Sequence, residues 1–479
     1  MSDLKGHQTS DYYFKYTDSE FERLDENYHH PRYDMIDQLF ARSKYRSLFL
    51  KVGESEDCLL QKMSSGGTPE KVRYLNGNGG VAFLGAGDID SRGNIDLENA
   101  RRIETSIHLG ELGNSQIRRK DVLVTMAGTV GHCAMYESEM ECNCNQAIAV
   151  LCPNDDKVNP QYLARYLNST LAQLQFGKLQ HIADQPNINL DEMQKIRVIL
   201  PDLDEQSAIL SEVERIEKKA ISKEKATDSR LEQVDKVVMD ELGIAIPDLG
   251  ECDYYSLSPQ LMSSRLDFSY NEPFYGLLEE AMQGCQYEFL ALVPPLVTYS
   301  EETTNPLERP NESFEYVDIS NIDIRWGEMK SVVMSGKDAT SSRVRRVMHG
   351  GEILISTTRP TRRAIAMVSD ELDGQVCSTG FAVLRCSQGI DKHYLLCILR
   401  SNLLKAQFER YSSGSSYPEI NKDNDLPLVR IPSPPLNLQK KIVREVFDMM
   451  KEAKVLDAEA QSKWNEAQAR FDSLLISAD

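Results

Sequence analysis

Pro201-Asp202-Leu203-Asp204-Glu205-Gln206 and Pro434-Pro435-Leu436-Asn437-Leu438-Gln439 begin two similar segments, which start 233 residues apart (434 minus 201). In each segment apolar residues follow at steps of three and four, the spacing of one face of an α-helix. Asp204 suits the N-terminal cap of the first helix, and Leu242-Gly243 suits its C-terminus because glycine accepts the conformation that ends a helix. The sequence therefore predicts two long helices, one in the middle of the chain and one at its end.

The apolar residues of the two predicted helices form narrow stripes, as in the seam of a two-helix coiled coil. The stripes contain Ile209, Val213, Ile216, Ala220, Leu231, Val234, Val238, Ile442, Val446, Met449, Ala453, Leu456, Ala460, Trp464, Ala467, Phe471 and Leu474. Helices of about 38 residues reach roughly 57 Å at about 1.5 Å per residue. Two helices of matching length are better explained by packing on each other than by each docking on its own domain. Antiparallel packing would give the chain pseudo-two-fold symmetry.

The rest of the chain is duplicated as well. Residues 83–90 return as 316–323, 121–125 as 352–356, 149–151 as 382–384, and 23–33 as 265–275. The order is kept, and the period is too long for a solenoid. We therefore predict one globular module at 1–199 and a second at 244–430, with the long helices at 200–243 and 431–479.

Each module shows a mixed pattern of helices and strands, which predicts an α+β fold. In the first module we expect a helical segment ending near Phe49, then strands at 122–126, 131–136 and 147–151 in one compact sheet. A short helix at 162–174 should follow, with its counterpart at 394–408 in the second module. In this arrangement the loops between strands present side chains to a partner.

Composition points to a folded, acidic protein. The chain has 479 residues, a formal net charge of −20 and 10 cysteines. It has no stretch of about 18 apolar residues and no signal peptide is apparent, so we expect a cytoplasmic protein with reduced cysteines. The negative charge argues against binding of nucleic acid by bulk attraction, but it leaves room for a local basic face.

Cations gather beside the predicted strands in both modules. They are Arg101, Arg102, Arg118, Arg119, Lys120, Arg343, Arg345, Arg346, Arg359, Arg362 and Arg363. Any one cluster is compatible with an ordinary solvated surface. Recurrence in both modules favours a role in binding.

Patterns for catalysis are weak. Residues 83–87, Phe-Leu-Gly-Ala-Gly, resemble a methyltransferase loop for S-adenosylmethionine, but the repeat at 316–320 lacks both glycines. Cys133, Cys142, Cys144 and Cys152 lack paired C-x-x-C spacing, so we interpret them as core thiols and predict no metal site. No phosphate-binding loop or hydrolase motif occurs.

The chain resembles the specificity subunit of a Type I DNA restriction-modification system. The strings that carry this resemblance, in order along the chain, are 66–69, 316–322, 356–361, 378–385, 412–422 and the two helix starts at 200–206 and 431–439. The resemblance implies two target recognition domains, each reading one half of a split DNA sequence, held apart by two antiparallel helices that also dock methyltransferase subunits. A translocating restriction subunit would complete the assembly.

The same resemblance implies a non-catalytic chain that binds no cofactor, with S-adenosylmethionine, ATP and Mg on the partner subunits. The acidity of this chain departs from the pattern that the resemblance implies. We therefore expect the partner subunits to supply many of the contacts to the DNA backbone. Two alternatives stay open. One is the specificity subunit of a Type IIB or another phage-defence methylation system, and the other is an acidic interaction or DNA-mimic protein.

Overall fold

The fold is that of a computed structural model, which describes residues 8–9, 12–13, 27–28, 30–69, 74–75, 79–181, 186–247, 269–387, 389–414 and 417–476. It divides into two compact units, Met1–Ser222 with Glu459–Asp479, and Lys223–Ala458. Each unit therefore contains one globular module and about half of each long helix. The domain boundaries predicted from the sequence lie at the ends of the long helices. The boundaries of the compact units lie instead near the middles of both long helices.

The described residues of the first module form two four-stranded sheets and one two-stranded sheet, and the strands expected at 122–126, 131–136 and 147–151 lie together in the second four-stranded sheet, as the sequence predicted. The first sheet has the order β6 (Arg101–Ile103), β5 (Val81–Leu84), β10 (Cys142–Cys144), β7 (Gln116–Ile117). The second has the order β4 (Leu60–Ser65), β11 (Ile148–Pro153), β8 (Val122–Thr125), β9 (Cys133–Met135), and the small sheet pairs β12 (Arg197–Leu200) with β3 (Arg46–Phe49). A short hairpin, β1 (Gln8–Thr9) with β2 (Tyr12–Tyr13), precedes them.

The second module repeats this topology. Its sheets have the orders β18 (Val332–Ser335), β15 (Ser313–Val317), β22 (Gln375–Ser378), β19 (Val344–Met348), and β14 (Val297–Tyr299), β23 (Phe381–Cys386), β20 (Ile353–Ser356), β21 (Ile365–Met367). β13 (Phe289–Ala291) pairs with β24 (Arg430–Pro432), and a small hairpin pairs β16 (Ile322–Asp323) with β17 (Glu328–Met329), where the first module has the bridge between Ile89 and Ile95. The inferred duplication is therefore confirmed by strand order as well as by sequence.

Helices cover the sheets in equivalent places. The first module has α1 (Met35–Ala41), α2 (Thr105–Leu109), α3 (Pro160–Leu167), α4 (Thr170–Leu179) and α5 (Leu190–Met193), and the second has α7 (Pro273–Gln283), α8 (Lys392–Leu399) and α9 (Asn402–Tyr411). The single helices expected at 162–174 and 394–408 are each two helices. The breaks arise because Ser169 and Ser401 cap the second helix of each pair, where their hydroxyls accept the N–H groups of Ala172 and Leu404.

The expected helical segment ending near Phe49 is also wrong in its second half. The helix α1 ends at Ala41, and residues 46–49 form β3, which pairs antiparallel with β12. The apolar residues of this segment fit the spacing of a helix as well as that of a strand. The long-range pairing with β12 decides in favour of a strand.

The central strands are buried on both faces. In β8, Val122 and Val124 belong to the core beneath the helices, whereas Leu123 between them belongs to the core between the sheets. The strand β20 repeats this, with Ile353 and Ile355 on one side and Leu354 on the other. Successive side chains of a strand point to opposite faces, so an uninterrupted apolar strand joins the two cores of each module.

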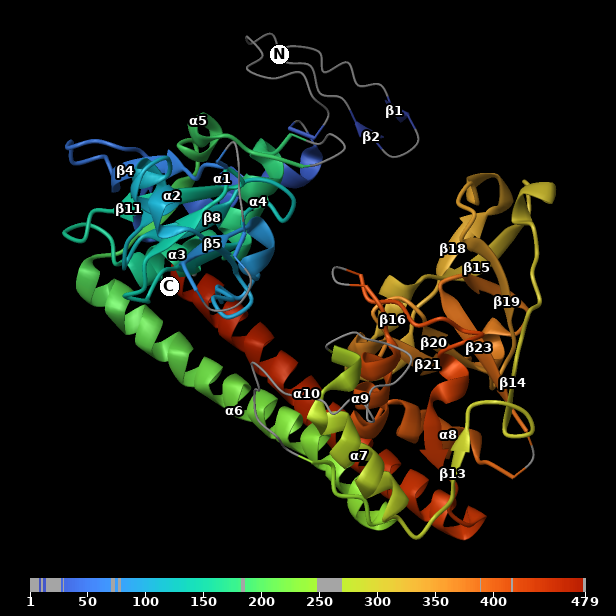
Figure 1. The fold of residues 1–479 in the computed structure, drawn as a ribbon. Coiled ribbons are helices and arrows are strands. Elements are labelled where there is room, and N and C mark those ends of the chain that lie inside the picture. The colour runs from blue at the N-terminus through green and yellow to red at the C-terminus, as the bar shows by residue number, and fades with distance from the viewer. Residues whose placement is uncertain are drawn as a thin grey trace. The chain divides into compact units, whose positions relative to one another are not determined.

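The long helices are α6 (Leu203–Leu242) and α10 (Leu436–Ile476), with 40 and 41 residues. Figure 1 shows them side by side. Glu212 pairs with Arg470 in the first unit, and Arg230 with Glu452 and Glu241 with Lys441 in the second. The residue numbers of the partners add to 682 in all three pairs, as antiparallel helices require. No described helix is long and apolar enough to cross a bilayer.

Small residues lie on the helix seam. Ala220, Thr227, Ala453, Ala460 and Ala467 are each at most 1% exposed. Of the other seam positions, Ile209, Val213, Ile216, Val238, Ile442, Val446 and Phe471 are buried, and Leu231, Val234, Met449, Leu456, Trp464 and Leu474 are half-buried. Small side chains let the helix backbones approach closely, because little volume separates them.

A buried glutamine ties each helix start to its module. Gln206 accepts the N–H of Asn159 at 2.8 Å through its side-chain oxygen, and Gln439 accepts the N–H of Asp391 at 2.8 Å. Their amide nitrogens donate to the carbonyls of Pro201 and Pro434. The shared proline-to-glutamine spacing in the sequence thus fixes the angle at which each helix leaves its module. The capping side chain of α6 is Asp202, which accepts the N–H of Glu205, and not the expected Asp204.

Candidate nucleic-acid interface

Three backbone segments meet at one end of the second module. Thr357 donates its N–H to Gly380 O at 2.9 Å, Ile420 donates to Thr357 O at 2.9 Å, and Arg359 donates to Pro418 O. We call this meeting of residues 357–359, 378–380 and 418–420 the second loop junction. It joins the β20–β21 loop, the β22–β23 turn and the segment after α9.

The first module has the same junction. Met126 donates its N–H to Ala147 O at 2.7 Å, Ile188 donates to Met126 O at 2.9 Å, and Gly128 donates to Pro186 O at 3.2 Å. Each donor and acceptor lies 231 to 233 positions before its counterpart in the second module. Residues 126–128, 145–147 and 186–188 therefore form the first loop junction on the same hydrogen-bonded frame.

The side chains on these two frames differ. The second junction carries Thr357, Thr358 and Arg359, where the first carries Met126, Ala127 and Gly128. The guanidinium of Arg359 lies 4.2 Å from the ring centroid of Tyr417, which is 65% exposed. Arg359 has a φ of 50°, a left-handed conformation that is uncommon for a non-glycine residue and marks a locally strained loop. The shared frame therefore carries partly exposed side chains at residues 357–359 of the second module, whereas Met126 of the first is only 7% exposed and belongs to the core.

The segment 66–67 packs closely against the first junction. Gly66 donates its N–H to Ile148 O and Gly67 donates to Cys144 O at 3.1 Å. A Cβ added at Gly66 would lie 2.2 Å from Asn145 O. Glycine is therefore required at this position because two backbones touch there. This explains the Gly-Gly-Thr-Pro string in structural terms.

The cations of β19 have different environments. Arg343 is exposed, and its side chain has no hydrogen-bond partner among the described residues; its carbonyl accepts the N–H of Thr379, beside the second loop junction. Arg345 donates to the neighbouring carbonyl of Val344. Arg346 is only 11% exposed in its side chain, donates to Ser300 O at 2.9 Å and lies 3.8 Å from Glu301. Arg343 is thus open to a ligand, and Arg346 is held inside the fold.

The cations of the β20–β21 loop divide in the same way. Arg362 is exposed and its side chain has no partner in the described part of the chain. Arg363 has a φ of 58° and donates to Arg400 O at 3.0 Å. Arg400 in turn donates to the carbonyls of Ile365, Ile324 and Arg325, and burial lowers its pKa to about 10. Arg363 and Arg400 therefore hold loops together.

The cations of the first module are spread over one sheet. Arg101 stacks on Tyr74 with its guanidinium 4.8 Å from the ring centroid, and Arg102 donates to Leu97 O at 3.4 Å. Both lie on the edge strand β6, whereas residues 118–120 follow β7 at the opposite edge. The structure therefore does not bring the two clusters together.

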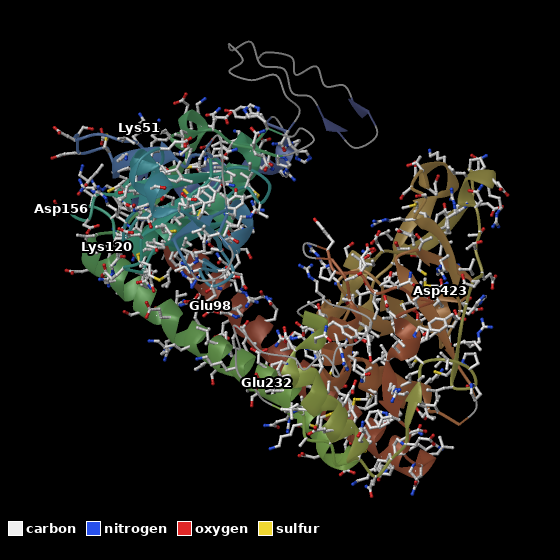
Figure 2. The ribbon with its side chains drawn as sticks, viewed as in Figure 1. Lys51, Glu98, Lys120, Asp156, Glu232 and Asp423 are labelled. Carbon is white, nitrogen blue, oxygen red and sulfur yellow. The ribbon has the colours of Figure 1, made fainter. Side chains whose placement is uncertain are left out.

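Two of the three cations after β7 are already paired. Arg119 binds Glu139 at 2.8 Å and Lys120 binds Asp155 at 2.7 Å. Figure 2 shows Lys120 at the surface of the first unit. Arg118 is exposed, and its backbone N–H donates to the buried carboxylate of Asp121 at 2.8 Å, whose pKa burial raises. Only the Arg118 side chain is without a partner among the described residues in this turn.

Of the predicted cations, the structure thus gathers Arg343, Arg359 and Arg362 around the second loop junction. Phosphates are bound by guanidinium groups, hydroxyls and backbone N–H groups, and base edges by side chains that project from such loops. The sequence reading missed Tyr417 and Arg400. Tyr417 follows a Gly-Ser-Ser run typical of an exposed loop. Arg400 has no sequence signal, because its role depends on three distant carbonyls.

The Phe-Leu-Gly-Ala-Gly segment has a structural role. Gly85 donates its N–H to Asp88 Oδ2 at 2.7 Å at the start of a short turn, and Asp318 donates to Asn321 Oδ1 at 2.9 Å at the start of the equivalent turn. The same turn therefore forms without the two glycines.

The cysteine cluster belongs mostly to the core, as expected. Cys133, Cys142 and Cys144 are buried, whereas Cys152 is half-buried. Burial raises the pKa of Cys142 to about 12. Among the described residues, no three His, Cys, Asp or Glu side chains group as metal ligands.

Comparison with known proteins identifies the class of this interface. Residues 59–233 match the family described as Type I restriction modification DNA specificity domain. The matched residues cover most of the first module and most of α6. Over 184 residues the chain is 26% identical to the Type I restriction enzyme EcoBI specificity subunit of Escherichia coli, and the match spans 38% of this chain and 38% of that relative. Residues 59–233 of the chain are therefore similar to the Type I restriction-modification specificity proteins.

Solved structures with a similar arrangement are remote. The chain is 16% identical to one from a study of complex assembly and conformational transition of the type I R-M system, with a TM-score of 0.42 over 86% of this chain and 97% of that one. It is 14% identical to the Type-I restriction-modification system S subunit from M. genitalium, with a TM-score of 0.38 over 90% and 96% of the two chains. The resemblance to this family therefore depends on the sequence match over residues 59–233.

Proposed function

We propose that this chain is the sequence-recognition subunit of a Type I restriction-modification complex and binds a double-stranded DNA target with two specified halves. The observation that carries this proposal is the pair of loop junctions, which share one hydrogen-bonded frame and differ in side chains. The match of residues 59–233 to a family described as Type I restriction modification DNA specificity domain supports it. A second copy with other side chains on the same frame suits a second half-site of different sequence.

In this proposal the side chains at each junction read base edges in the major groove. The frame positions them before DNA binds, so little conformational entropy is lost on binding. Arg343 and Arg362 set the register by binding phosphates, which carry no sequence information. Among the described residues at the second junction, Arg343 and Arg362 are the predicted cations whose side chains have no partner, and the chain has a net charge of −20. Partner subunits then supply the other contacts to the DNA backbone.

The long helices serve as the spacer between half-sites and as the docking surface for methyltransferase subunits. Exposed apolar side chains on α10 support a partner there, since Phe447 is 70% exposed and Val455 is 53% exposed. The methyltransferase subunits would bring S-adenosylmethionine, and a translocating restriction subunit would bring ATP and Mg. The chain itself is non-catalytic in this proposal, and the assembly works in the cytoplasm.

A unit exchange tests the proposal. The core of the first module includes Ala467, Phe471 and Leu475 of α10, so an exchange limited to the module would leave a foreign core without its partners. Met1–Ser222 and Glu459–Asp479 should therefore be replaced together by the equivalent parts of another specificity subunit. The expected hybrid recognises one new half-site and retains the other. If both halves of the recognised sequence change together, the modules do not read separate half-sites.

A further inference from the structure

An equivalent turn in each module carries an arginine to the long helices. In the first module, Asp90 accepts the N–H groups of Arg92 and Asn94 through its side chain, each at 2.9 Å. In the second, Asp323 accepts the N–H groups of Arg325 and Trp326 at 2.9 Å and 3.1 Å. Asp90 and Asp323, like Arg92 and Arg325, are 233 positions apart. A carboxylate that accepts N–H groups two and more residues on stabilises a tight turn.

In the first unit, Arg92 reaches α10. Its guanidinium donates to Gln461 Oε1 at 3.0 Å and lies 4.9 Å from the ring centroid of Trp464. The two helix residues are three positions apart, so they present neighbouring surfaces to the arginine. The module is thereby attached to the helix through an exposed turn as well as through its core.

In the second unit, Arg325 reaches both helices. It binds Asp228 of α6 at 2.8 Å and lies 3.6 Å from Asp457 of α10. Lys454 of α10 pairs with Glu328 at the end of the same turn. The partners differ in type from those of Arg92, yet an arginine at the same place in the repeat makes the contact. Two modules thus use the same position for the same attachment.

These contacts lie beyond the buried attachments along the helices. Gln461 is six residues from Ala467, the nearest residue of α10 in the core of the first module, and Asp228 is six residues from Val234, which packs against the core of the second. Six residues of helix span about 9 Å. A module held at two points about 9 Å apart cannot rock about the first point without breaking the second.

We propose that Arg92 and Arg325 are positioning residues that fix the angle of each module on the helix pair and thereby set the spacer length accepted between the two half-sites. This inference rests on the proposed function. Neighbouring base pairs differ by about one tenth of a helical turn, so a rocking module would accept half-sites shifted by one base pair. The arginines do not read bases; they restrict where the reading surfaces point.

The test compares the double variant Arg92→Ala/Arg325→Ala with wild type, as full chains bound to their methyltransferase subunits. Duplexes carry the two half-sites selected by wild type, with the preferred spacer or one longer or shorter by about one base pair. Wild type should prefer its spacer by about tenfold or more, the scale of one mismatched base pair, and the double variant by about two- to threefold. Binding to a single half-site should be equal for both proteins, because the junctions are unchanged.

Two further variants complete the test. Arg309→Ala is the matched control, since Arg309 is an exposed arginine whose ion pair with Glu312 stays within one loop region of the second module; it should keep the wild-type spacer preference. Gln461→Ala with Asp228→Ala removes one helix partner of each arginine and leaves Trp464 and Asp457, so it should broaden the preference in the same direction as the arginine variant. Because both changes lie on the helices, this result cannot come from misfolding of the modules. Equal discrimination by wild type and both double variants overturns this inference alone. Wild type that ignores spacer length overturns it together with the proposed function.

Discussion

Lengthening the helix pair by whole heptads should move the half-sites apart by a calculable distance. Partners on α6 and α10 have residue numbers that add to 682, so a break between Ser222 and Lys223 is level with one between Glu459 and Ala460. The first break is a boundary between the two compact units along the chain and the second lies one residue from the other boundary, so every module-to-helix contact described above stays in its own unit. A full heptad keeps each apolar seam facing its partner.

The magnitude follows from helix geometry. Seven residues in each helix lengthen the pair by about 10.5 Å at about 1.5 Å per residue, which equals about 3 base pairs at about 3.4 Å each. Three base pairs also turn the second half-site by about 100°, because B-DNA has about 10 to 10.5 base pairs per turn. Three heptads lengthen the pair by about 31.5 Å, or about 9 base pairs, and nearly restore the rotational phase.

The assay is selection of bound duplexes in which the spacer length is varied between fixed half-sites. The one-heptad variant should bind more weakly than wild type and favour a spacer about 3 base pairs longer, and the three-heptad variant should regain affinity with a spacer about 9 base pairs longer. An insertion in one helix alone is the control and should abolish bipartite binding, since it breaks the pairing of the seam. Folded variants that keep the original spacer would refute the view that the helices set the distance.

Three other outcomes are expected. Arg343→Ala should weaken binding to all sequences and lower by about one unit the slope of log binding constant against log salt concentration. Arg346→Ala removes a largely buried side chain and should instead lower the midpoint of urea unfolding. Equal effects of both variants on the salt slope would contradict the distinction between an open and an enclosed arginine. Ala453→Leu should destabilise the protein by about 1 to 3 kcal/mol in urea, because Ala453 is fully buried on the seam, and an unchanged midpoint would show a loosely packed seam. The pKa of His349 is raised above its ordinary value of 6.5, chiefly by its hydrogen bond to Glu302, so its stabilising contribution is full below that value and is lost as pH rises through the raised pKa. His349→Ala should therefore lower the unfolding midpoint more at about pH 5.5 than at about pH 8.5, and the reverse order would disprove the assignment.

The long helices and the duplication were visible in the sequence because their signals are local or periodic. Apolar steps of three and four predicted both helices, and the retained order of segments predicted two similar modules. The two breaks at Ser169 and Ser401 were missed because a capping serine inside an apolar pattern looks like an ordinary helical residue. The strand at 46–49 was missed because its partner β12 lies about 150 residues away in the chain.

The candidate interface was only partly predictable. The strings at 356–361, 378–385 and 412–422 were singled out, but that they meet at one junction depends on hydrogen bonds between distant backbones. Their clustering in the sequence marked eleven cations. It did not distinguish Arg343, which is exposed, from Arg346, whose side chain is largely buried. Arg92 and Arg325 were overlooked because a single arginine in a polar turn has no pattern of its own, and only the helix beside it gives it a role.

The most direct test of the account is the sequence bound by the full chain together with its methyltransferase subunit, selected from random duplexes. The account predicts two specified half-sites of different sequence, separated by a spacer of fixed length and free sequence. A single continuous recognition sequence, or binding without sequence preference, would contradict it.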